Sequence, residues 1–330
     1  MTWEGQQVTV TGAGGFIGSH LVEYLAGEGA RVRAFVRYNS RADQGNLGFL
    51  NARLAGNVEV DYGDLRDEDA VRAALEGSAY VFHLGALIGI PYSYRHPRDV
   101  VETNVIGTLN VLQAARVTAP TRVVHVSTSE VYGSARRIPI DETHPLQGQS
   151  PYSASKIGAD KIAESFHKSF GLPVVTVRPF NTYGPRQSAR AIIPTIISQG
   201  LGPHRIRLGS LSPTRDFTFV RDTVRGMALA AGAPQAEGLE VNLGSNAAIS
   251  IGELVTRIAG IMGIDVAVED NDGERVRPVN SEVQRLHADN ARARQLLAWQ
   301  PEVSLDEGLK ETVEWIARHR DLYRPAVYQT

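Results

Sequence analysis

The segment from Val8 to Gly18 constrains the fold more than any other part of the chain. Its pattern predicts a β-strand, a tight turn with glycines at positions 12, 15 and 18, and the beginning of a helix. Glycine permits the turn, and free N–H groups at the beginning of a helix stabilise the charge of a pyrophosphate. A turn without any ligand can have the same pattern, but this position between the first strand and the first helix favours nucleotide binding. The residues expected at this site are Gly12, Gly15, Phe16, Ile17 and Gly18.

Short runs of β-branched residues alternate with helical patterns through the first half of the chain. This alternation predicts a Rossmann-type α/β fold, in which a doubly wound parallel sheet carries helices on both faces. The residues Val101, Val105, Leu109 and Leu112 recur with the period of an amphipathic helix and are expected to face the sheet. The expected strands cover residues 7–10, 31–36, 58–60, 80–84, 122–126 and 174–177.

After Arg178 the pattern changes to loops rich in proline, glycine and arginine, interrupted by predicted helices at 251–262 and 305–319. We therefore expect two unequal lobes: a dinucleotide-binding domain at 1–180 and a smaller α/β substrate-binding lobe at 181–330. A short strand-like run at 239–243 is expected to return to the main sheet, so the chain would pass between the lobes more than once.

Composition excludes several classes of protein. The formal net charge of −2 gives no overall positive field for nucleic acid or an anionic membrane. The absence of cysteine excludes disulfides and a thiol nucleophile, and the nine histidines show no HExxH spacing, so no metal is expected. The longest apolar stretch, 81–90, is far shorter than the ~20 residues of a membrane helix, and the amino terminus does not resemble a signal peptide. We expect a soluble, cytoplasmic protein.

The end of the second strand bears on the choice of dinucleotide. An acid there would bind the ribose hydroxyl of NAD, whereas an arginine favours the extra phosphate of NADP. This chain has Arg37, which an ordinary exposed arginine explains equally well, so both NAD and NADP stay open. Asp64 and Leu65, after the third strand, and Leu84, at the end of the fourth, are expected to border the cofactor.

The run from Ser150 to Lys156 predicts a helix with Ser150 as its N-cap and Pro151 at its first position. Tyr152 and Lys156 then lie four residues apart on one face. The ammonium group and the positive end of the helix are expected to lower the pKa of the Tyr152 phenol from its usual ~10 and so prepare a base for a hydroxyl group.

Such a pair is common on surface helices, but a second segment supports a catalytic role. Thr128, Ser129 and Glu130 follow the fifth strand, at the edge of the sheet where open α/β folds bind ligands. A solvated loop acid is the simple alternative for Glu130.

These motifs, together with Arg178-Pro179-Phe180-Asn181-Thr182-Tyr183-Gly184-Pro185, resemble an extended short-chain dehydrogenase/reductase of the nucleotide-sugar epimerase and dehydratase group. The resemblance covers essentially the whole chain. It implies a tightly bound NAD or NADP that is recycled in each cycle, and catalytic roles for Thr128, Tyr152 and Lys156. It further implies a structural role for Asn104, a homodimer through the helices near 101–115 and 152–170, and a nucleotide-sugar substrate. The residues expected to bind that substrate are Asn181, Arg190, Arg215 and Arg277.

Members of the epimerase and dehydratase group share an oxidation at sugar carbon 4 and differ in the reaction that follows. Glu130 is the residue that indicates which reaction this is. A ketone at carbon 4 acidifies the proton on carbon 5, which a carboxylate can remove while the hydroxyl on carbon 6 leaves. The Thr-Ser-Glu triplet therefore favours a 4,6-dehydratase, although Ser129 replaces the Asp of dTDP-glucose 4,6-dehydratases and leaves the proton donor undefined, with Glu130 itself a candidate.

The run at 145–161 most resembles 4,6-dehydratases of legionaminic-acid-type pathways, which act on UDP- or GDP-activated N-acetylglucosamine. A UDP-glucuronate decarboxylase, a nucleotide-sugar 4-epimerase and a dinucleotide-binding regulator without activity remain the alternatives.

Overall fold

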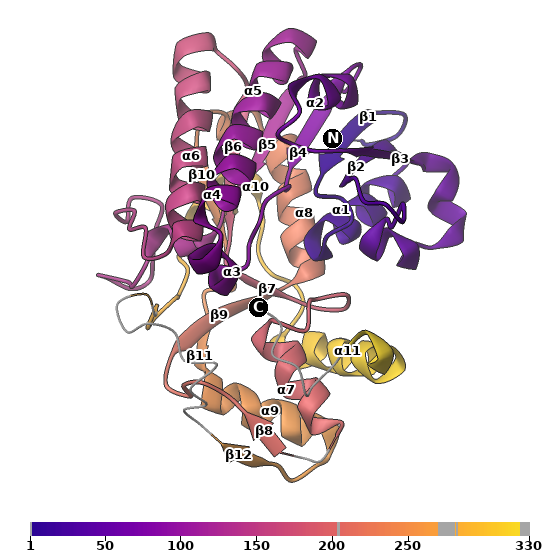
Figure 1. Ribbon diagram of the computed structural model, residues 1–330. Helices are drawn as coiled ribbons and strands as arrows, with labels where there is room; N and C mark the ends of the chain where they lie inside the picture. Colours follow the sequence, from indigo (N-terminus) through magenta and orange to yellow (C-terminus); the bar gives the residue numbers. More distant parts are fainter. Residues whose placement is uncertain (1, 203–204, 270–280, 282, 324–330) are drawn as a thin grey trace.

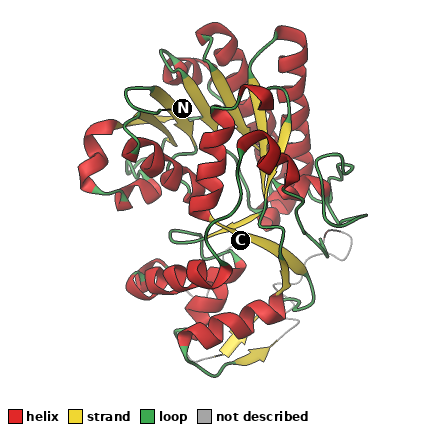
Figure 2. Cartoon of the chain, turned by 180° about the vertical axis from the view of Figure 1, so that it is seen from behind, coloured by secondary structure: helices red, strands yellow, loops and turns green. Residues whose placement is uncertain are grey.

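The computed structural model describes residues 2–202, 205–269, 281 and 283–323 of the chain. Figures 1 and 2 show a larger lobe built on one sheet and a smaller lobe packed against the carboxyl ends of its strands. All neighbouring strands of the large sheet run parallel, which confirms the Rossmann-type α/β fold. In spatial order its strands are β10 (Glu240–Leu243), β6 (Val174–Pro179), β5 (Arg122–Val126), β4 (Tyr80–His83), β1 (Gln7–Thr11), β2 (Arg31–Arg37) and β3 (Val58–Gly63).

Helices cover both faces of this sheet because successive strand residues point to opposite sides. On β5, Val124 packs in the core under α1 (Phe16–Gly27) and α8 (Val220–Ala231). Its neighbour Val123 packs in the opposite core. The helices on that second face are α2 (Glu68–Leu75), α5 (Gly107–Thr118) and α6 (Pro151–Phe170).

The strand order reverses between β1 and β4, which places the ligand crevice of an open α/β sheet at their carboxyl ends. Two backbone segments approach closely there, since a Cβ atom added to Gly12 would lie 2.8 Å from the Cα of Gly85. Gly12 also has a φ of +68°, a conformation that favours glycine. The turn after β1 therefore requires glycine on two counts.

In its described residues, the smaller lobe consists of two short sheets and the helices that cover them (Figure 1). In one sheet β9 (Thr214–Phe219) lies between β7 (Asn181–Tyr183) and β11 (Ala248–Ser250). The other pairs β8 (Arg205–Arg207) with β12 (Ala267–Glu269). The helices are α7 (Ile192–Gly200), α9 (Ile251–Met262) and α11 (Leu305–Arg318).

Part of the second half of the chain returns to the large lobe. The strand expected at 239–243 is present as β10, and it pairs with β6. The helix α8 packs against α1, and α10 (Ala291–Leu297) packs against β10. The division into domains at 1–180 and 181–330 stays a prediction.

The local sequence accounts for the limits of α6. The Ser150 hydroxyl accepts from the Ser153 N–H at 3.1 Å, and the Ser153 hydroxyl accepts from the Ser150 N–H at 2.9 Å. Ser150 is thus the predicted N-cap, followed by Pro151 at the first position. The helix ends at Gly171, whose φ is +65°. Within the described part of the chain, no helix is both long and apolar enough to cross a membrane.

The prediction that an apolar stripe at 101–112 faces the sheet is wrong in part. The helix is divided into α4 (Pro97–Val101), a π-helical turn η3 (Glu102–Ile106) and α5. Leu112 is buried as expected, but Val101 is exposed. The buried face includes Asn104 and Thr108, whose side chains form internal hydrogen bonds. A search for apolar periodicity misses them because they are polar.

Candidate functional site

One cleft of about 840 Å³ runs from the crevice at β1 and β4 to the smaller lobe. It brings together every described residue that the sequence singles out as a catalytic, cofactor or substrate candidate. These are Gly12, Gly15, Phe16, Ile17, Gly18, Arg37, Asp64, Leu65, Leu84, Thr128, Ser129, Glu130, Tyr152, Lys156, Asn181, Arg190 and Arg215. Arg277 lies outside the described residues. The roles of these residues stay predictions.

The glycine-rich end of the cleft is shaped for a pyrophosphate. The 12-residue helix α1 begins after Gly15 with no side-chain cap, so its first N–H groups are available to an anion. A Cβ atom added to Gly18 would lie 2.2 Å from the Gly12 carbonyl oxygen, which explains why the helix and turn can pack so closely. The described residues therefore fit a bound dinucleotide.

The two charged candidates at the adenosine end differ in their surroundings. Arg37 is exposed at the end of β2 and lines the cleft. Asp64 forms an ion pair with Arg66 at 2.7 Å, and the hydrogen bond from Arg66 lowers the pKa of its carboxyl group. Part of the hydrogen-bonding capacity of Asp64 is thus already used by Arg66.

A polar chain under the crevice was not anticipated from the sequence. The His83 ring bonds through Nδ1 to the Thr11 hydroxyl at 2.8 Å and through Nε2 to the Thr108 hydroxyl at 3.0 Å. Burial holds the pKa of His83 well below its ordinary value, so the ring is neutral at pH 7. The Thr11 hydroxyl also accepts from the Gly85 N–H at 3.1 Å, which joins the ends of β1 and β4.

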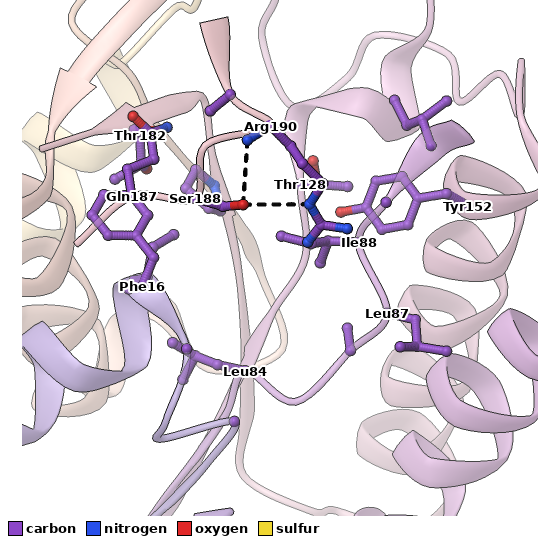
Figure 3. A pocket seen from close by; sticks show the side chains of 18 of the residues that line it. Phe16, Leu84, Leu87, Ile88, Thr128, Tyr152, Thr182, Gln187, Ser188 and Arg190 are labelled. Carbon is purple, nitrogen blue, oxygen red and sulfur yellow. Dashed lines mark hydrogen bonds between the residues drawn. The ribbon is translucent and has the colours of Figure 1, made fainter. Parts of the chain in front are cut away.

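Tyr152 and Lys156 lie on the buried face of α6, with the Tyr152 hydroxyl beside Thr128 (Figure 3). Burial raises the pKa of the Tyr152 phenol, while a hydrogen bond with Thr128 lowers it by a smaller amount. The expected lowering below the usual value is therefore wrong, because burial outweighs the favourable contacts. Burial also lowers the pKa of Lys156 to about 8, against a raising influence of Asp160.

Glu130 is presented by a single helical turn, η4 (Ser129–Tyr132). The Thr128 hydroxyl caps this turn by accepting from the Glu130 N–H at 3.2 Å. Glu130 is half-buried, lines the cleft, and its charge raises the pKa of Tyr152. A carboxylate and a phenol therefore face the same cleft space, with Thr128 next to both.

Asn104 connects the cleft wall to α6. Its Nδ2 donates to the Leu87 carbonyl oxygen at 3.0 Å and to the Ser155 hydroxyl at 2.9 Å, and its Oδ1 accepts from the Leu87 N–H at 2.7 Å. These bonds hold the loop after β4 in place. Asn104 lies in the π-helical turn η3, a distortion that is frequent at functional sites.

The candidates from the second half of the chain have separate local partners. The Nε of Arg190 donates to the Ser188 hydroxyl at 3.3 Å, and a Cβ atom added to Gly89 would lie 3.1 Å from Nη1 of Arg190. Asn181 donates to the Asp216 carbonyl oxygen at 3.4 Å. Arg215 is buried and donates to the Thr214 carbonyl oxygen at 3.0 Å. The guanidinium of Arg190 thus lies against the loop after β4, on the wall of the cleft.

Sequence reasoning missed several cleft residues. The loop after β4 contributes Ile88 and Gly89, and the smaller lobe contributes Gln187, Ser188 and Leu208. The loop after β4 could have been inferred, because it follows a strand beside the reversal of strand order. Residues such as Ser188 lie in loops whose path depends on tertiary packing and carry no local signal.

Comparisons with known proteins agree with this arrangement. The profile of the family described as GDP-mannose 4,6 dehydratase matches residues 9–312. A UDP-glucose 4-epimerase of Mycolicibacterium smegmatis is 35% identical, over 93% of this chain and 97% of its own. A dTDP-glucose 4,6-dehydratase of Streptomyces griseus is also 35% identical, over 96% of each chain. DesIV, a dTDP-glucose 4,6-dehydratase from Streptomyces venezuelae solved with NAD bound, matches with a TM-score of 0.87 and 31% identity, over 97% of this chain and 99% of its own.

Proposed function

Because this chain belongs to the GDP-mannose 4,6-dehydratase family of extended short-chain dehydrogenase/reductases, we propose that it is a nucleotide-sugar 4,6-dehydratase. It converts an NDP-hexose to the 4-keto-6-deoxy sugar and water. The observation that carries this proposal is the position of Glu130, a carboxylate in the same cleft as Tyr152 and next in space to Thr128.

Tyr152 removes the proton from the hydroxyl on sugar carbon 4. Thr128 is hydrogen-bonded to the Tyr152 phenol, so its hydroxyl lies where it can orient the same sugar hydroxyl. The bound dinucleotide supplies the hydride acceptor for carbon 4 and later the hydride donor for carbon 6. Lys156 offsets the negative charge that develops on Tyr152, which burial alone would disfavour.

Glu130 carries the second half of the reaction. Its carboxylate takes the proton from carbon 5, which the neighbouring ketone has made acidic, and the carbon–oxygen bond at carbon 6 breaks. The departing hydroxyl needs a proton to leave as water. Glu130 supplies it, because Ser129 stands where a second carboxylate would otherwise do so. When hydride reaches carbon 6, carbon 5 regains a proton that comes from water through Glu130, and Tyr152 releases to water the proton it took from the carbon 4 hydroxyl.

The substrate is a UDP- or GDP-activated N-acetylglucosamine, as the resemblance at 145–161 implies. Arg190 and Arg215 bind its diphosphate together with Asn181, since a guanidinium can donate two hydrogen bonds to one phosphate. Arg277 is proposed for the same task from the sequence alone.

The dinucleotide is NAD. DesIV supports this choice, because it shares the fold over nearly its whole length and was solved with NAD. Arg37, which would favour NADP, is an exposed side chain at the edge of the cleft.

The enzyme is a homodimer formed through residues 101–115, which run from the end of α4 through η3 into α5, and through α6. This proposal is supported by exposed apolar side chains along those helices, among them Ile106, Val117 and Phe170. A monomer would leave these side chains in water.

The test incubates the protein with NAD or NADP and a panel of nucleotide sugars, and weighs the products. Loss of water from UDP- or GDP-N-acetylglucosamine supports the proposal. An unchanged mass with a new stereoisomer identifies a 4-epimerase, the activity named for the relative in Mycolicibacterium smegmatis. Loss of carbon dioxide from a uronic acid identifies a decarboxylase, and tight dinucleotide binding without turnover identifies a regulator.

A further inference from the structure

A buried charged cluster lies behind the Tyr152–Lys156 pair, away from the cleft. Asp160 Oδ2 accepts from the Nε and Nη2 of Arg178 at 3.2 and 3.1 Å, and Asp160 Oδ1 bonds to His125 Nε2 at 3.1 Å. The side chains of Asp160 and Arg178 are each only 2% exposed. Buried ion pairs add little net stability because both charges lose their hydration, so stability alone does not explain this pair.

Arg178 forms hydrogen bonds to residues of both α6 and η4, the two elements that carry the catalytic candidates. Through Asp160 it holds α6, one turn beyond Lys156. Its Nη1 donates to the Tyr132 hydroxyl at 3.1 Å, and Tyr132 is the last residue of η4, the turn that presents Glu130. The guanidinium also lies 5.2 Å from the centre of the Tyr132 ring. The Arg178 side chain therefore connects α6, which carries Tyr152 and Lys156, to η4, which carries Glu130.

Tyr132 is itself held on its far side. Its hydroxyl donates to Asn242 Oδ1 at 2.7 Å, and Asn242 Nδ2 donates to the Ile140 carbonyl oxygen at 3.0 Å. The turn η4 is thus connected to β10, and Arg178 completes the connection to α6. Movement of η4 relative to α6 would break several buried hydrogen bonds at once.

The same pair sets the charge near Lys156. The carboxylate of Asp160 raises the pKa of Lys156 against the larger effect of burial. Arg178 carries the opposite charge beside Asp160, whose pKa is lowered to about 2 by His125 and Arg178 in spite of burial. The ionisable groups around Lys156 are Tyr152 and Asp160 on α6, His125 on β5, His83 on β4, Arg178 on β6 and Glu130 on η4. Burial lowers the pKa of both histidines, so the fixed charges behind the pair are those of Asp160 and Arg178, with the partly exposed carboxylate of Glu240 4.0 Å from Arg178.

We propose that Asp160 and Arg178 are positioning residues for the oxidation at carbon 4, acting through Lys156 and Tyr132. Their ion pair holds the Tyr152–Lys156 helix against the Thr128–Glu130 turn, and it balances the charge behind Lys156. This inference rests on the catalytic roles proposed for Tyr152 and Lys156.

The first experiment measures the pH at which Lys156 loses its proton, in the absence of substrate. The chain has only four lysines, so lysine labelled with carbon-13 gives few NMR signals, and Lys156→Met assigns the one of interest. Asp160→Asn removes a negative charge and is expected to move the titration of Lys156 by about one pH unit to lower pH. Arg178→Gln removes a positive charge and is expected to move it to higher pH. An unmoved titration in Asp160→Asn, or shifts of both variants in the same direction, would overturn the proposal.

The second experiment measures positioning with Tyr132→Phe, which keeps every formal charge and removes the hydrogen bonds of the Tyr132 hydroxyl to Arg178 and Asn242, and so both links of η4 through this side chain. We expect kcat for cofactor reduction to fall about tenfold with KM and the pH profile unchanged. The matched control is Glu240→Gln, whose carboxylate lies 4.0 Å from Nη2 of Arg178, whereas Tyr132 is bonded by Nη1. This variant is expected to leave kcat and the pH profile unchanged. A wild-type kcat in Tyr132→Phe would contradict the positioning role.

Two other results can be told apart from these outcomes: a variant that does not fold, and a proposed function that is wrong. If a single-charge variant does not fold, the double variant Asp160→Asn with Arg178→Gln removes both charges together. Its Lys156 titration is expected to lie close to that of the unmodified protein, and a displacement as large as one pH unit would contradict charge balance. Cofactor reduction is common to dehydratases, epimerases and decarboxylases, so a product other than the dehydrated sugar overturns the proposed function alone. The titration decides the charge effect even if no sugar is turned over.

Discussion

Lys156 Nζ donates a hydrogen bond of 2.8 Å to the carbonyl oxygen of Val126, the last residue of β5. This bond places the ammonium group at the carboxyl edge of the sheet, two residues before Thr128. The bond does not offset burial, because the pKa of Lys156 is lowered to about 8. The folded protein therefore holds a charged group at a site that disfavours it, as is common where function sets the side chain.

Replacing Lys156 with methionine should stabilise the fold while abolishing activity. The pKa of Lys156 is about 8 in the folded state and 10.5 for a free side chain, so below pH 8 the folded state bears the full cost of the ammonium. The unfolded chain binds more protons between those two pH values, so this cost disappears as pH rises through that window. We expect Lys156→Met to raise the free energy of unfolding by about 2 kcal/mol at pH 7 and by nearly nothing above pH 10.5.

Urea denaturation at a series of pH values measures this effect. Lys161→Met is the matched control, because Lys161 is exposed on the same helix and pairs only with Glu164 among the ion pairs described for it. Its unfolding free energy should change by less than about 0.5 kcal/mol at every pH. A loss of stability in Lys156→Met that does not depend on pH would show that the ammonium is not costly.

Tyr152→Phe should abolish oxidation at carbon 4. The variant keeps the ring and its packing but has no hydroxyl to receive the substrate proton, so cofactor reduction is expected to slow by about a thousandfold or more. Reduced nicotinamide absorbance in a single turnover measures the step. Thermal unfolding checks that the fold is retained, since the lost hydroxyl bonds only to Thr128 among the contacts described. Oxidation at an undiminished rate would remove Tyr152 from the mechanism.

The sequence predicted the elements that follow local rules and missed those that depend on packing. The glycine turn, the Ser150 N-cap and the returning strand follow from spacing and capping chemistry, and each is present. The buried face of η3 and α5 did not follow, because Asn104 and Thr108 occupy core positions that only their hydrogen-bond partners make acceptable. The raised pKa of Tyr152 was missed for a related reason: burial is a property of the whole fold.

Glu130→Gln should separate oxidation from elimination. The amide cannot accept the proton on carbon 5, whereas Tyr152, Lys156 and Thr128 are unchanged, so the ketone and the reduced cofactor should accumulate. We expect release of water to slow by about a hundredfold or more. In heavy water, the unmodified enzyme should introduce deuterium at carbon 5 and the variant should not. Glu164→Gln, which alters a half-buried carboxylate of α6 that pairs with Lys161 and Lys168, serves as the control. Normal water loss in Glu130→Gln would refute the assignment of the base.

Gly12→Ala should weaken dinucleotide binding far more than the replacement of a glycine at the other end of α1. Its Cβ would lie 2.8 Å from Gly85 Cα, and a φ of +68° is unfavourable for alanine. The turn must shift, so we expect NAD to bind about a hundredfold more weakly by titration calorimetry. Gly27 is the matched control at the other end of α1, where an added Cβ meets nothing within 4 Å. Gly27→Ala should bind NAD normally, and equal losses in both variants would argue against a role for the turn.

The proposed dimer can be tested at the exposed apolar face of α4 and η3. Val101 is 44% exposed and Ile106 is 42% exposed, and both lie beside α6, which the proposal places in the same interface. Changing both to glutamate places two like charges from each subunit in a buried surface, which costs far more than the loss of the apolar contacts alone. We expect sedimentation velocity to show a dimer for the unmodified protein and a monomer for this variant. Val268→Glu, a charge on the exposed strand β12 of the smaller lobe, should leave the dimer intact. A dimer that survives the double change would place the interface elsewhere on the molecule.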